Sequence, residues 1–434
     1  MNAPLGIAVL GAGTVGREVV RAFLETPDRL ASGGPRLVLA GVAVRDVERA
    51  VADGIPRALL TTDPVTLAAA DRVDVVCELL GGEEPARSVI AAALDAGKPV
   101  VTANKQVVAR HGPELEAAAR RGGGVIRFEA AVGGGIPVLA TLAGDLAANR
   151  VTRLRAIVNG TTNVILSAMA RDGSPYEVAL AAAQAAGYAE ADPTADVEAV
   201  DAANKLAILS RVAVGAWLDP DAIERRPPTV LDRGRSGIAA VTAQSVTGAA
   251  AVGRVLKLVA DLDVETDGAI SASVLPTALP VDDPLGRTDG RMNRIEVRAE
   301  PVGSVALVGP GAGGSATASA VLGDLLAIGR GEGSTWAGRE AASDDARAPL
   351  RPPRAGPGRG WFLVLPPELS AAAVASGLDA PVECAPIAGG TAVHVAGASL
   401  AEVRATVRAA ADRSGAGRAG VDSIVIFPAG EHLP

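Results

Sequence analysis

The sequence predicts an α/β protein that begins with a doubly wound parallel sheet and continues into α+β segments. Over roughly the first 130 residues, short apolar runs alternate with alanine-rich stretches, which is typical of strand–helix–strand units. After about residue 150 this alternation ends, which indicates a different architecture. The length of 434 residues and the 49% hydrophobic content leave room for two or three domains, each with its own core.

Charge and cysteine content exclude several classes of protein. The formal net charge of −8 disfavours a nucleic-acid partner. Two cysteines, Cys77 and Cys384, cannot form the set of disulfides that would stabilise a chain of this length, so we expect a reducing, cytoplasmic setting. The apolar stretch Ser304–Gly329 contains Pro310 and five glycines before Leu325, so it predicts a buried loop and helix, and we expect no membrane partner.

The first part of the chain contains five apolar runs that predict parallel strands. Glycine, proline or polar residues bound each run, and helix-like segments such as Arg17–Leu24 separate them. The expected strands are Leu5–Gly11, Leu37–Val44, Asp74–Leu80, Pro99–Thr102 and Gly124–Glu129. We therefore expect a first domain over residues 1–135, completed by about 301–335.

The remainder of the chain predicts an α+β region and a small C-terminal unit. We expect helices at Tyr176–Ala186 and Val197–Val214, separated by a loop at Ala189–Asp196 that contains Pro193. We expect strands at Ala269–Pro276 and Ile295–Ala299, and a glycine-rich loop followed by a helix over Ala306–Gly329. The expected domains are a catalytic and dimerisation domain over 136–300, a proline- and arginine-rich linker over 336–360, and an α+β domain over 361–434.

Gly11, Gly13 and Gly16 form a G-x-G-x-x-G motif directly after the first expected strand. Glycines in such a turn let a pyrophosphate approach bare backbone N–H groups, and the helix that follows offers its positive N-terminus to the anion. The motif therefore predicts a Rossmann-type dinucleotide site that includes Thr14 and Val15. The alternative is a glycine-rich turn without a ligand.

The end of the second expected strand bears on the choice between NADP and NAD. Arg45 lies where a guanidinium could bind a 2′-phosphate, whereas Asp46 could accept a ribose hydroxyl. We expect NADP(H) to be preferred, with NAD(H) possible. The alternative is that Arg45 is a solvated loop charge.

A late acidic segment, GYAEADPTADVEAVDAANK, carries the candidate chemistry. Asp201 and Lys205 are four residues apart and would share one helix face, with Glu190 and Asp196 in the preceding loop. Hydride reduction of a carbonyl creates an alkoxide that needs a proton donor within hydrogen-bond reach, and Lys205 is our candidate. Spacing alone leaves open an ordinary ion pair on a solvated face, but only four of the 41 lysine and arginine residues are lysines.

These motifs, taken together, resemble the homoserine dehydrogenase family. The similar segments are GAGTVG, TTDP, ELLGGEEPAR, TANK, FEAAVGGGIP, NGTTN, GYAEADPTADVEAVDAANKLAIL and GPGAGGSATASAVLGDLL, which together span about residues 5–330. The resemblance implies NAD(P)-dependent interconversion of L-aspartate 4-semialdehyde and L-homoserine, a step toward threonine, isoleucine and methionine.

The resemblance also implies roles for individual residues. Lys205 matches the catalytic lysine, with Lys105 and Asp201 as further catalytic residues, and Glu190, Asp196 and Asp201 match substrate-binding residues. Whether Lys205 would donate its proton directly or through a bound water stays open. The implied cofactor residues are Gly11, Gly13, Thr14, Val15, Gly16, Arg45, Thr102, Ala103, Lys105, Gly187 and Gly311.

FEAAVGGGIP resembles the family's site for a monovalent cation. The resemblance implies that Glu129 and the carbonyls of Val132, Gly134 and Ile136 would hold a structural sodium ion. Hard cations prefer oxygen ligands, which these groups supply. The alternative is a tight turn in which Glu129 caps a helix.

The segment Gly360–Pro434 occupies the place of the family's ACT domain, a small ligand-sensing module, but resembles it poorly. Its first loop has Pro366 and Pro367 and no glycine, so we expect an ACT-like fold that has lost ligand binding. The resemblance further implies a homodimer or homotetramer.

Three other functions fit the residues less well. One is a non-catalytic nucleotide-binding protein of the same fold, which would have no reason to keep all four of Lys105, Glu190, Asp201 and Lys205. Another is a reductase for a different small amino aldehyde. The third is an enzyme that works through a thioester. It is disfavoured, because Cys77 lies in an apolar expected strand and is predicted to be a core residue.

Overall fold

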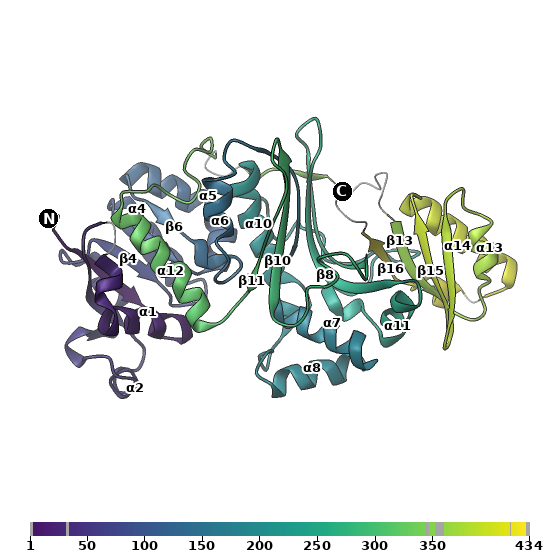
Figure 1. Cartoon of the computed structure of the whole chain (residues 1–434), viewed down its shortest axis with the longest axis horizontal. Coiled ribbons are helices and arrows are strands. Elements are labelled where there is room, and N and C mark those ends of the chain that lie inside the picture. Colours follow the sequence, from purple (N-terminus) through teal and green to yellow (C-terminus); the bar gives the residue numbers. More distant parts are fainter. Residues whose placement is uncertain (1–2, 32–33, 343–346, 352–359, 417, 431–434) are drawn as a thin grey trace. The chain divides into compact units, whose positions relative to one another are not determined.

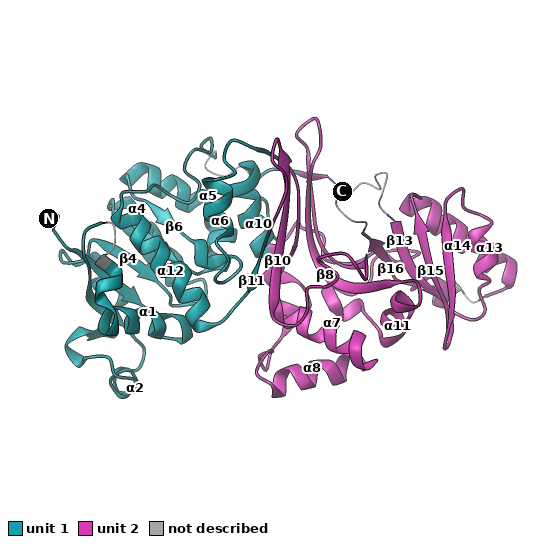
Figure 2. Ribbon diagram, in the orientation of Figure 1, with its two compact units in different colours: residues 1–151, 204–220, 307–349 teal, residues 152–203, 221–306, 350–434 magenta. Residues whose placement is uncertain are grey.

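The computed structural model describes residues 3–31, 34–342, 347–351, 360–416 and 418–430, which form two compact units. Unit 1 comprises residues 1–151, 204–220 and 307–349, and unit 2 comprises 152–203, 221–306 and 350–434 (Figure 2). The expected domains at 136–300 and 361–434 thus fall mainly in unit 2. Part of the expected linker, 343–346 and 352–359, lies outside the described residues. None of the helices in the described ranges is long and apolar enough to span a membrane.

Unit 1 contains the parallel sheet that the sequence predicts. Its six strands lie in the order β3-β2-β1-β4-β5-β6, and every described pair is parallel. Figure 1 labels β4 and β6 of this sheet. The order reverses between β1 and β4, and ligands of such sheets bind at the carboxyl ends of the strands beside this reversal. The strands are β1 (Leu5–Leu10), β2 (Leu37–Ala43), β3 (Leu60–Thr61), β4 (Val75–Glu78), β5 (Val100–Thr102) and β6 (Ile126–Arg127).

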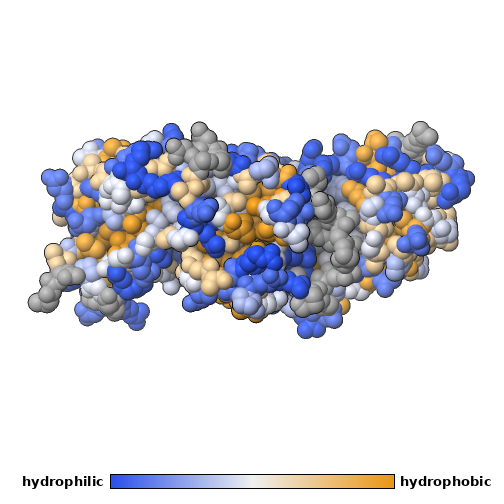
Figure 3. Space-filling view, turned by 90° about the horizontal axis from the view of Figure 1, so that it is seen from above, coloured by the Kyte–Doolittle hydropathy of each residue, from blue (hydrophilic) through white to orange (hydrophobic). Residues whose placement is uncertain are grey.

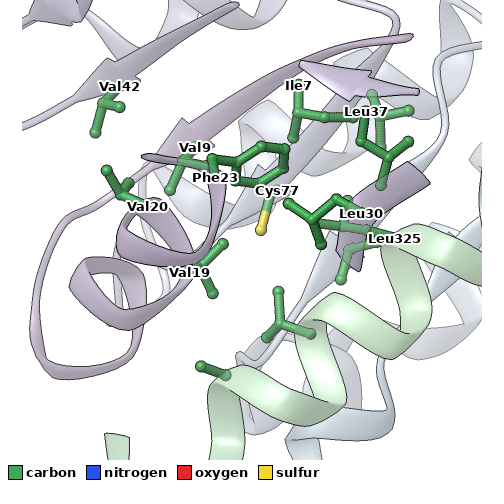
Figure 4. Packing of buried hydrophobic residues seen from close by; sticks show 14 of the residues in the cluster. Ile7, Val9, Val19, Val20, Phe23, Leu30, Leu37, Val42, Cys77 and Leu325 are labelled. Carbon is green, nitrogen blue, oxygen red and sulfur yellow. The ribbon is translucent and has the colours of Figure 1, made fainter. Parts of the chain in front are cut away.

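Helices cover this sheet because each buries an apolar stripe. In α1, Val19, Val20 and Phe23 point into the core, and Leu325 of α12 joins them (Figure 4). Cys77 lies in the same cluster, as expected of a core residue. The helices of this unit, apart from α10, are α1 (Thr14–Glu25), α2 (Val47–Ala52), α3 (Pro64–Ala69), α4 (Ala86–Asp95), α5 (Lys105–Gly122), α6 (Val138–Ala143) and α12 (Gly314–Gly329).

The second sheet belongs to unit 2 except for the ends of β7 and β11. Its main path runs β11-β10-β7-β8-β9-β16-β13-β15-β14, with β12 beside β9. The first strands are β7 (Arg150–Ile157), β8 (Arg254–Val264), β9 (Ile270–Pro280), β10 (Met292–Glu300), β11 (Gly303–Pro310) and β12 (Leu350–Arg351). The accompanying helices are α7 (Gly160–Asp172), α8 (Tyr176–Ala185) and α11 (Ala243–Ala251).

Two expectations for this region were wrong in detail. Residues 303–310 form strand β11 rather than a loop, because the alternating run GSVALV pairs at the sheet edge despite its flanking glycines. The expected loop and helix between Ala189 and Val214 are two helices, α9 (Thr194–Val197) and α10 (Val200–Val214). Pro193 does not prevent α9, because it precedes the first helical residue, where a missing N–H costs nothing. Ala199 interrupts the helix with a left-handed φ of 64°.

Along the chain, the C-terminal segment has the element order β-α-β-β-α-β, with the additional short helix α15 (Arg418–Asp422) before the last strand. Its strands pair in the order β16-β13-β15-β14, and Val403 and Val407 of α14 pack in the core on one face. Helix α11 packs closely on the other face, where a Cβ added to its Gly248 would lie 2.9 Å from the side chain of Val364. The elements are β13 (Gly360–Leu365), α13 (Ala371–Ala375), β14 (Val382–Ile387), β15 (Gly390–Ala396), α14 (Leu400–Ser414) and β16 (Ile426–Ala429).

Candidate functional site

Unit 1 has a cavity of about 550 Å³ at the carboxyl ends of β1, β2 and β4. Residues that the sequence assigns to a cofactor form part of its wall, namely Gly11, Gly13, Thr14 and Arg45. The rest of the wall includes Arg17, Asp46, Arg49, Asp53, Leu79, Leu80, Gly81 and Glu84. The cavity is therefore where the glycine motif and the end of the second strand meet.

The three motif glycines meet different steric demands. Gly11 has a φ of 102°, and a Cβ there would lie 2.4 Å from the Leu79 carbonyl oxygen. A Cβ on Gly16 would lie 2.0 Å from the Gly11 carbonyl oxygen, so this glycine lets helix α1 pack close to the strand. Gly13 has no atom within 4 Å of such a Cβ, so its backbone faces open space where a ligand can approach.

The two side chains at the end of β2 have different tasks. Asp46 caps α2 through one carboxylate oxygen, which accepts the Arg49 N–H at 3.0 Å. Arg45 is exposed at the cavity wall, beside Arg17 and Arg49. Arg17 lies 3.6 Å from Asp53, which also lines the cavity. This part of the wall thus offers several guanidinium groups, and one Asp46 oxygen is already used by the helix cap.

Other predicted cofactor residues do not line this cavity. Val15 packs against the core of unit 1, and Gly16 lies behind the turn. Gly311 packs against Gly134: a Cβ added to Gly134 would lie 2.7 Å from the carbonyl carbon of Gly311. Gly187 follows helix α8 in unit 2 with a φ of 74°. Their assignment to the cofactor stays a prediction.

Thr102, Ala103 and Lys105 lie at the carboxyl end of β5, where α5 begins. Asn104 caps α5 through its side-chain oxygen, which accepts the Val107 N–H at 3.2 Å, and Lys105 is the first residue of the helix. The Asn104 N–H donates to the Thr102 hydroxyl at 2.9 Å. We refer to residues 102–105 as the β5–α5 turn.

Sequence reasoning missed Glu78, which supports this turn. The Thr102 hydroxyl donates to one oxygen of its carboxylate at 2.6 Å, and the Leu80 N–H donates to the other at 2.8 Å. The Glu78 side chain is fully buried, and this burial raises its pKa above the ordinary value of 4.5. The available signal was a carboxylate in the otherwise apolar run VVCELL.

In unit 2, Asn159 brings together two of the predicted substrate residues. Its side-chain N–H groups donate to Asp196 at 2.7 Å and to Asp201 at 2.9 Å, while its oxygen caps α7 by accepting the Thr162 N–H at 2.9 Å. Glu190 is exposed, and its backbone carbonyl accepts a hydrogen bond from Gln184 at 3.0 Å. The sequence pointed to the NGTTN motif but not to this bridging role of Asn159.

Helix α10 carries both Asp201, in unit 2, and Lys205, in unit 1. The two residues are one helical turn apart, as their spacing predicts. Asp201 is 5% exposed and Lys205 is 8% exposed. An ion pair on a solvated helix face, the alternative interpretation, is therefore wrong. An ammonium group shielded in this way interacts more strongly with nearby charge than one in water.

The Glu129 carboxylate caps helix α6. Its two oxygens accept the N–H groups of Leu139 at 2.9 Å and Ala140 at 2.6 Å. Burial and the nearby Asp324 carboxylate raise the pKa of Glu129 to about 7. Arg127 binds Asp324 at 2.9 Å. Within the described ranges, no group of three histidine, cysteine, aspartate or glutamate side chains has the arrangement of a metal site.

Comparison with known proteins gives the same picture along most of the chain. The family profile "Homoserine dehydrogenase, NAD binding domain" matches residues 11–129, and the profile "Homoserine dehydrogenase" matches 137–326. The homoserine dehydrogenase of Corynebacterium glutamicum is 45% identical over 332 residues, which cover 75% of this chain and 72% of the relative. That of Bacillus subtilis is 39% identical over 324 residues, covering 74% and 72%.

Solved structures extend the similarity to the C-terminal segment. A homoserine dehydrogenase from Thiobacillus denitrificans has a TM-score of 0.82 and 31% identity, and 99% of each chain is covered. A hyperthermophilic archaeal homoserine dehydrogenase in complex with NADPH has a TM-score of 0.60 and 27% identity, covering 75% of this chain and 97% of that one.

Proposed function

The chain belongs to the homoserine dehydrogenase family, an NAD(P)-dependent group of oxidoreductases that act on a CH–OH group, and from this membership we propose which residues perform the reaction. The substrate pair is L-aspartate 4-semialdehyde and L-homoserine. Membership in a pathway toward threonine, methionine and isoleucine is part of the proposal.

Lys205 is the proposed proton donor. When bound, the reduced nicotinamide supplies a hydride to the aldehyde carbon, and the oxygen then needs a proton. The shielded position of Lys205 supports this role, because it is 8% exposed on a helix that also carries Asp201. A water between Lys205 and the substrate oxygen would serve the same chemistry.

Lys105, Thr102 and Ala103 are the proposed contacts at the nicotinamide end of the cofactor. Their place at the carboxyl end of β5 supports this, because ligands of doubly wound sheets bind at that edge. Lys105 begins α5, so its position follows from the capped turn described above. We assign it a catalytic role together with Lys205 and Asp201.

The substrate ammonium is the proposed partner of Glu190, Asp196 and Asp201. The bridge through Asn159 supports this assignment, since it holds two carboxylates within hydrogen-bond reach of one amide group. Two adjacent carboxylates also attract a cation to their side of the site. A substrate ammonium group would supply that positive charge.

NADP(H) is the proposed preferred cofactor, and NAD(H) remains a possible one. The cavity fits a dinucleotide phosphate because Gly13 exposes bare backbone and Arg45 lies at the wall. The use of Asp46 as a helix cap supports the preference, since one of its two oxygens already accepts a helix N–H. Thr14, Val15, Gly16, Gly187 and Gly311 complete the proposed cofactor residues.

A structural sodium ion is proposed at Glu129 and the carbonyls of Val132, Gly134 and Ile136. The donor set consists of oxygens, which suits a hard cation. Glu129 and Asp324 place two buried carboxylates near Arg127, so an added positive charge would improve the balance. The expected outcome is a higher melting temperature in sodium chloride than in choline chloride, and no such difference in Glu129→Gln.

We also propose a homodimer or homotetramer, a cytoplasmic location, and an ACT-like C-terminal segment that binds no effector. Strand β11 supports self-association, because it lies at the sheet edge, and Val302 and Val308 beside and within it are exposed. Apolar areas also interrupt the hydrophilic surface on the face drawn in Figure 3. Light scattering after size-exclusion chromatography tests the oligomeric state.

A substrate panel tests the proposed specificity. Purified enzyme is given NADPH or NADH with aspartate 4-semialdehyde, and separately with amino aldehydes one carbon shorter and one carbon longer. We expect the highest kcat/KM for aspartate 4-semialdehyde with NADPH. A higher value for another aldehyde would replace the proposed substrate but keep the reaction type, and turnover with none would contradict an enzyme of this class.

A further inference from the structure

Glu78 is a buried carboxylate that no step of the proposed reaction uses. It is the last residue of β4, and Thr102, the last residue of β5, is its register partner across the parallel pair. Both residues are 0% exposed. They lie at the carboxyl edge of the sheet, where the cofactor cavity opens and the β5–α5 turn begins.

The contacts of this carboxylate connect two parts of the site. One oxygen accepts the N–H of Leu80, which lines the cofactor cavity, at 2.8 Å. The other accepts the Thr102 hydroxyl at 2.6 Å, and that hydroxyl accepts the Asn104 N–H at 2.9 Å. Asn104 in turn caps the helix whose first residue is Lys105. A chain of three hydrogen bonds therefore runs from Glu78 to the start of α5.

An anion at this place is costly for the fold. The contacts that hold the Glu78 charge come from hydroxyl, side-chain amide and backbone N–H groups, all of them neutral donors, and burial raises its pKa nonetheless. Buried charges are ordinarily paired or replaced by apolar residues, since an uncompensated charge lowers stability. A perturbed titratable group at a site's edge is typical of a functional position.

We propose that Glu78 is a positioning residue, whose ionised carboxylate orients the β5–α5 turn through the Thr102 hydroxyl and so places Lys105. This inference rests on the proposed role of that turn at the nicotinamide end. An ionised carboxylate has no proton to donate, so the Thr102 hydroxyl must point its hydrogen at Glu78, which leaves the hydroxyl lone pairs for the Asn104 N–H. Protonation of Glu78 removes this constraint.

The test compares Glu78→Gln, Thr102→Val and the double variant with the wild type, by kcat with NADPH between pH 5.5 and 9. The wild-type rate should fall at the acid side, as pH drops through the raised pKa of Glu78. Glu78→Gln should lose about tenfold to a hundredfold in kcat at pH 7.5, the cost of a misplaced catalytic group, and should lack that acid-side fall. Thr102→Val, which keeps the carboxylate, should lose a similar factor.

The double variant shows whether the two residues act as one unit. If they do, its kcat should be no lower than that of Glu78→Gln. The proposal would be overturned if the double variant lost the product of the two single-variant factors in kcat. It would also be overturned by a Glu78→Gln enzyme that keeps the wild-type rate or its acid-side fall. Full activity in Thr102→Val would also overturn it, which keeps the test decisive if Glu78→Gln does not fold.

Thermal melting separates positioning from a purely structural role. A carboxylate whose pKa is raised by folding costs stability above its unfolded pKa, so Glu78→Gln should melt at or above the wild-type temperature at pH 7.5. A lower melting temperature with an unchanged pH profile would overturn the proposal. Asp74→Asn is the matched control: Asp74 precedes the same strand at its other end, accepts the Gly6 N–H at 2.7 Å, and should leave the pH profile unchanged.

Lys105→Met distinguishes failure of this inference from failure of the proposed function. If Lys105→Met keeps the full rate, the proposed role of the turn is wrong, whatever Glu78 does. If Lys105→Met is impaired while Glu78→Gln matches the wild type, only the positioning role of Glu78 is wrong.

Discussion

At the scale of single residues, the chemistry of this chain depends on a few charged side chains and on what each one contacts. Asp46 and Arg45 are adjacent in the sequence and both line the cavity, yet only Asp46 is also a helix cap. Asp196 and Asp201 carry like charges that one amide group separates. Cofactor choice and substrate binding can therefore be tested independently.

Arg45→Ser should reduce the preference for NADPH. Loss of a guanidinium that binds a 2′-phosphate removes a charge-assisted contact, so KM for NADPH should rise about tenfold to a hundredfold while KM for NADH stays nearly constant. Initial-rate kinetics with both cofactors measure this. Arg57→Ser is the control, because Arg57 pairs with Glu48 on the surface and does not line the cavity. Equal changes for NADPH and NADH would contradict a 2′-phosphate contact.

Asn159→Ala should raise KM for the aldehyde substrate about tenfold, because Asp196 and Asp201 lose the donor that holds them together. KM for NADPH should change little. Asn159→Asp, which is nearly isosteric and adds a third carboxylate, should impair substrate binding further. An Asn159→Asp enzyme with wild-type KM would show that this bridge has no part in substrate binding.

Residue types could be predicted here better than their contacts. The glycine motif, Arg45, Lys205 and Asp201 stand out because their spacing or rarity is visible in the sequence. Glu78 and Asn159 do not, since their roles arise from register across strands and from contacts 37 and 42 residues apart. A carboxylate in an apolar run gives a weak signal until its neighbours across the sheet are known.

At the scale of elements, a buried ion pair fixes α5, which carries Lys105, to α10, which carries Lys205. Arg211 binds both oxygens of Glu116 at 2.7 and 3.1 Å, and the Trp217 indole N–H donates to the same carboxylate at 2.9 Å. Arg211 and Glu116 are 1% and 2% exposed. This ion pair thus holds the helix that carries Lys105 and the helix that carries Lys205 in a fixed position relative to each other.

Arg211→Met should destabilise the protein by roughly 3–5 kcal/mol, because the buried Glu116 carboxylate then keeps only Arg120, at 3.7 Å, as a cation. Urea unfolding measures the change. The double variant Arg211→Met with Glu116→Leu should recover part of the loss, since no uncompensated charge remains. Arg57→Met, at an exposed ion pair, should unfold like the wild type. An equally stable Arg211→Met would contradict the bridging role of this pair.

The elements themselves were largely predictable, and their ends were not. The parallel strands follow from apolar runs, and α8 follows from its alanine-rich pattern. The break at Ala199 was missed because a left-handed alanine has no sequence signature. Strand β11 was missed because its glycines resemble a loop, whereas pairing at the sheet edge decides its conformation.

At the scale of the whole molecule, each unit is built on its own sheet. Residues 307–349 return to unit 1, where Ala318, Val321 and Leu325 of α12 complete the core beneath α1. The C-terminal segment instead continues the sheet of unit 2 through the pairing of β16 with β9. Helix α11 packs against its second face at Gly248, so that face is part of the interior of unit 2.

The proposed reaction and the proton-donor role of Lys205 are tested most directly by nicotinamide absorbance. The change is measured when aspartate 4-semialdehyde and NADPH are added to wild type, Lys205→Ala and Lys98→Ala. Lys98 is a matched control, because its ammonium donates to the Ala68 and Ala70 carbonyls, away from the proposed machinery. We expect rapid turnover by wild type and Lys98→Ala, and a loss of about a hundredfold or more in kcat for Lys205→Ala. Undiminished turnover by Lys205→Ala would contradict the proton-donor role.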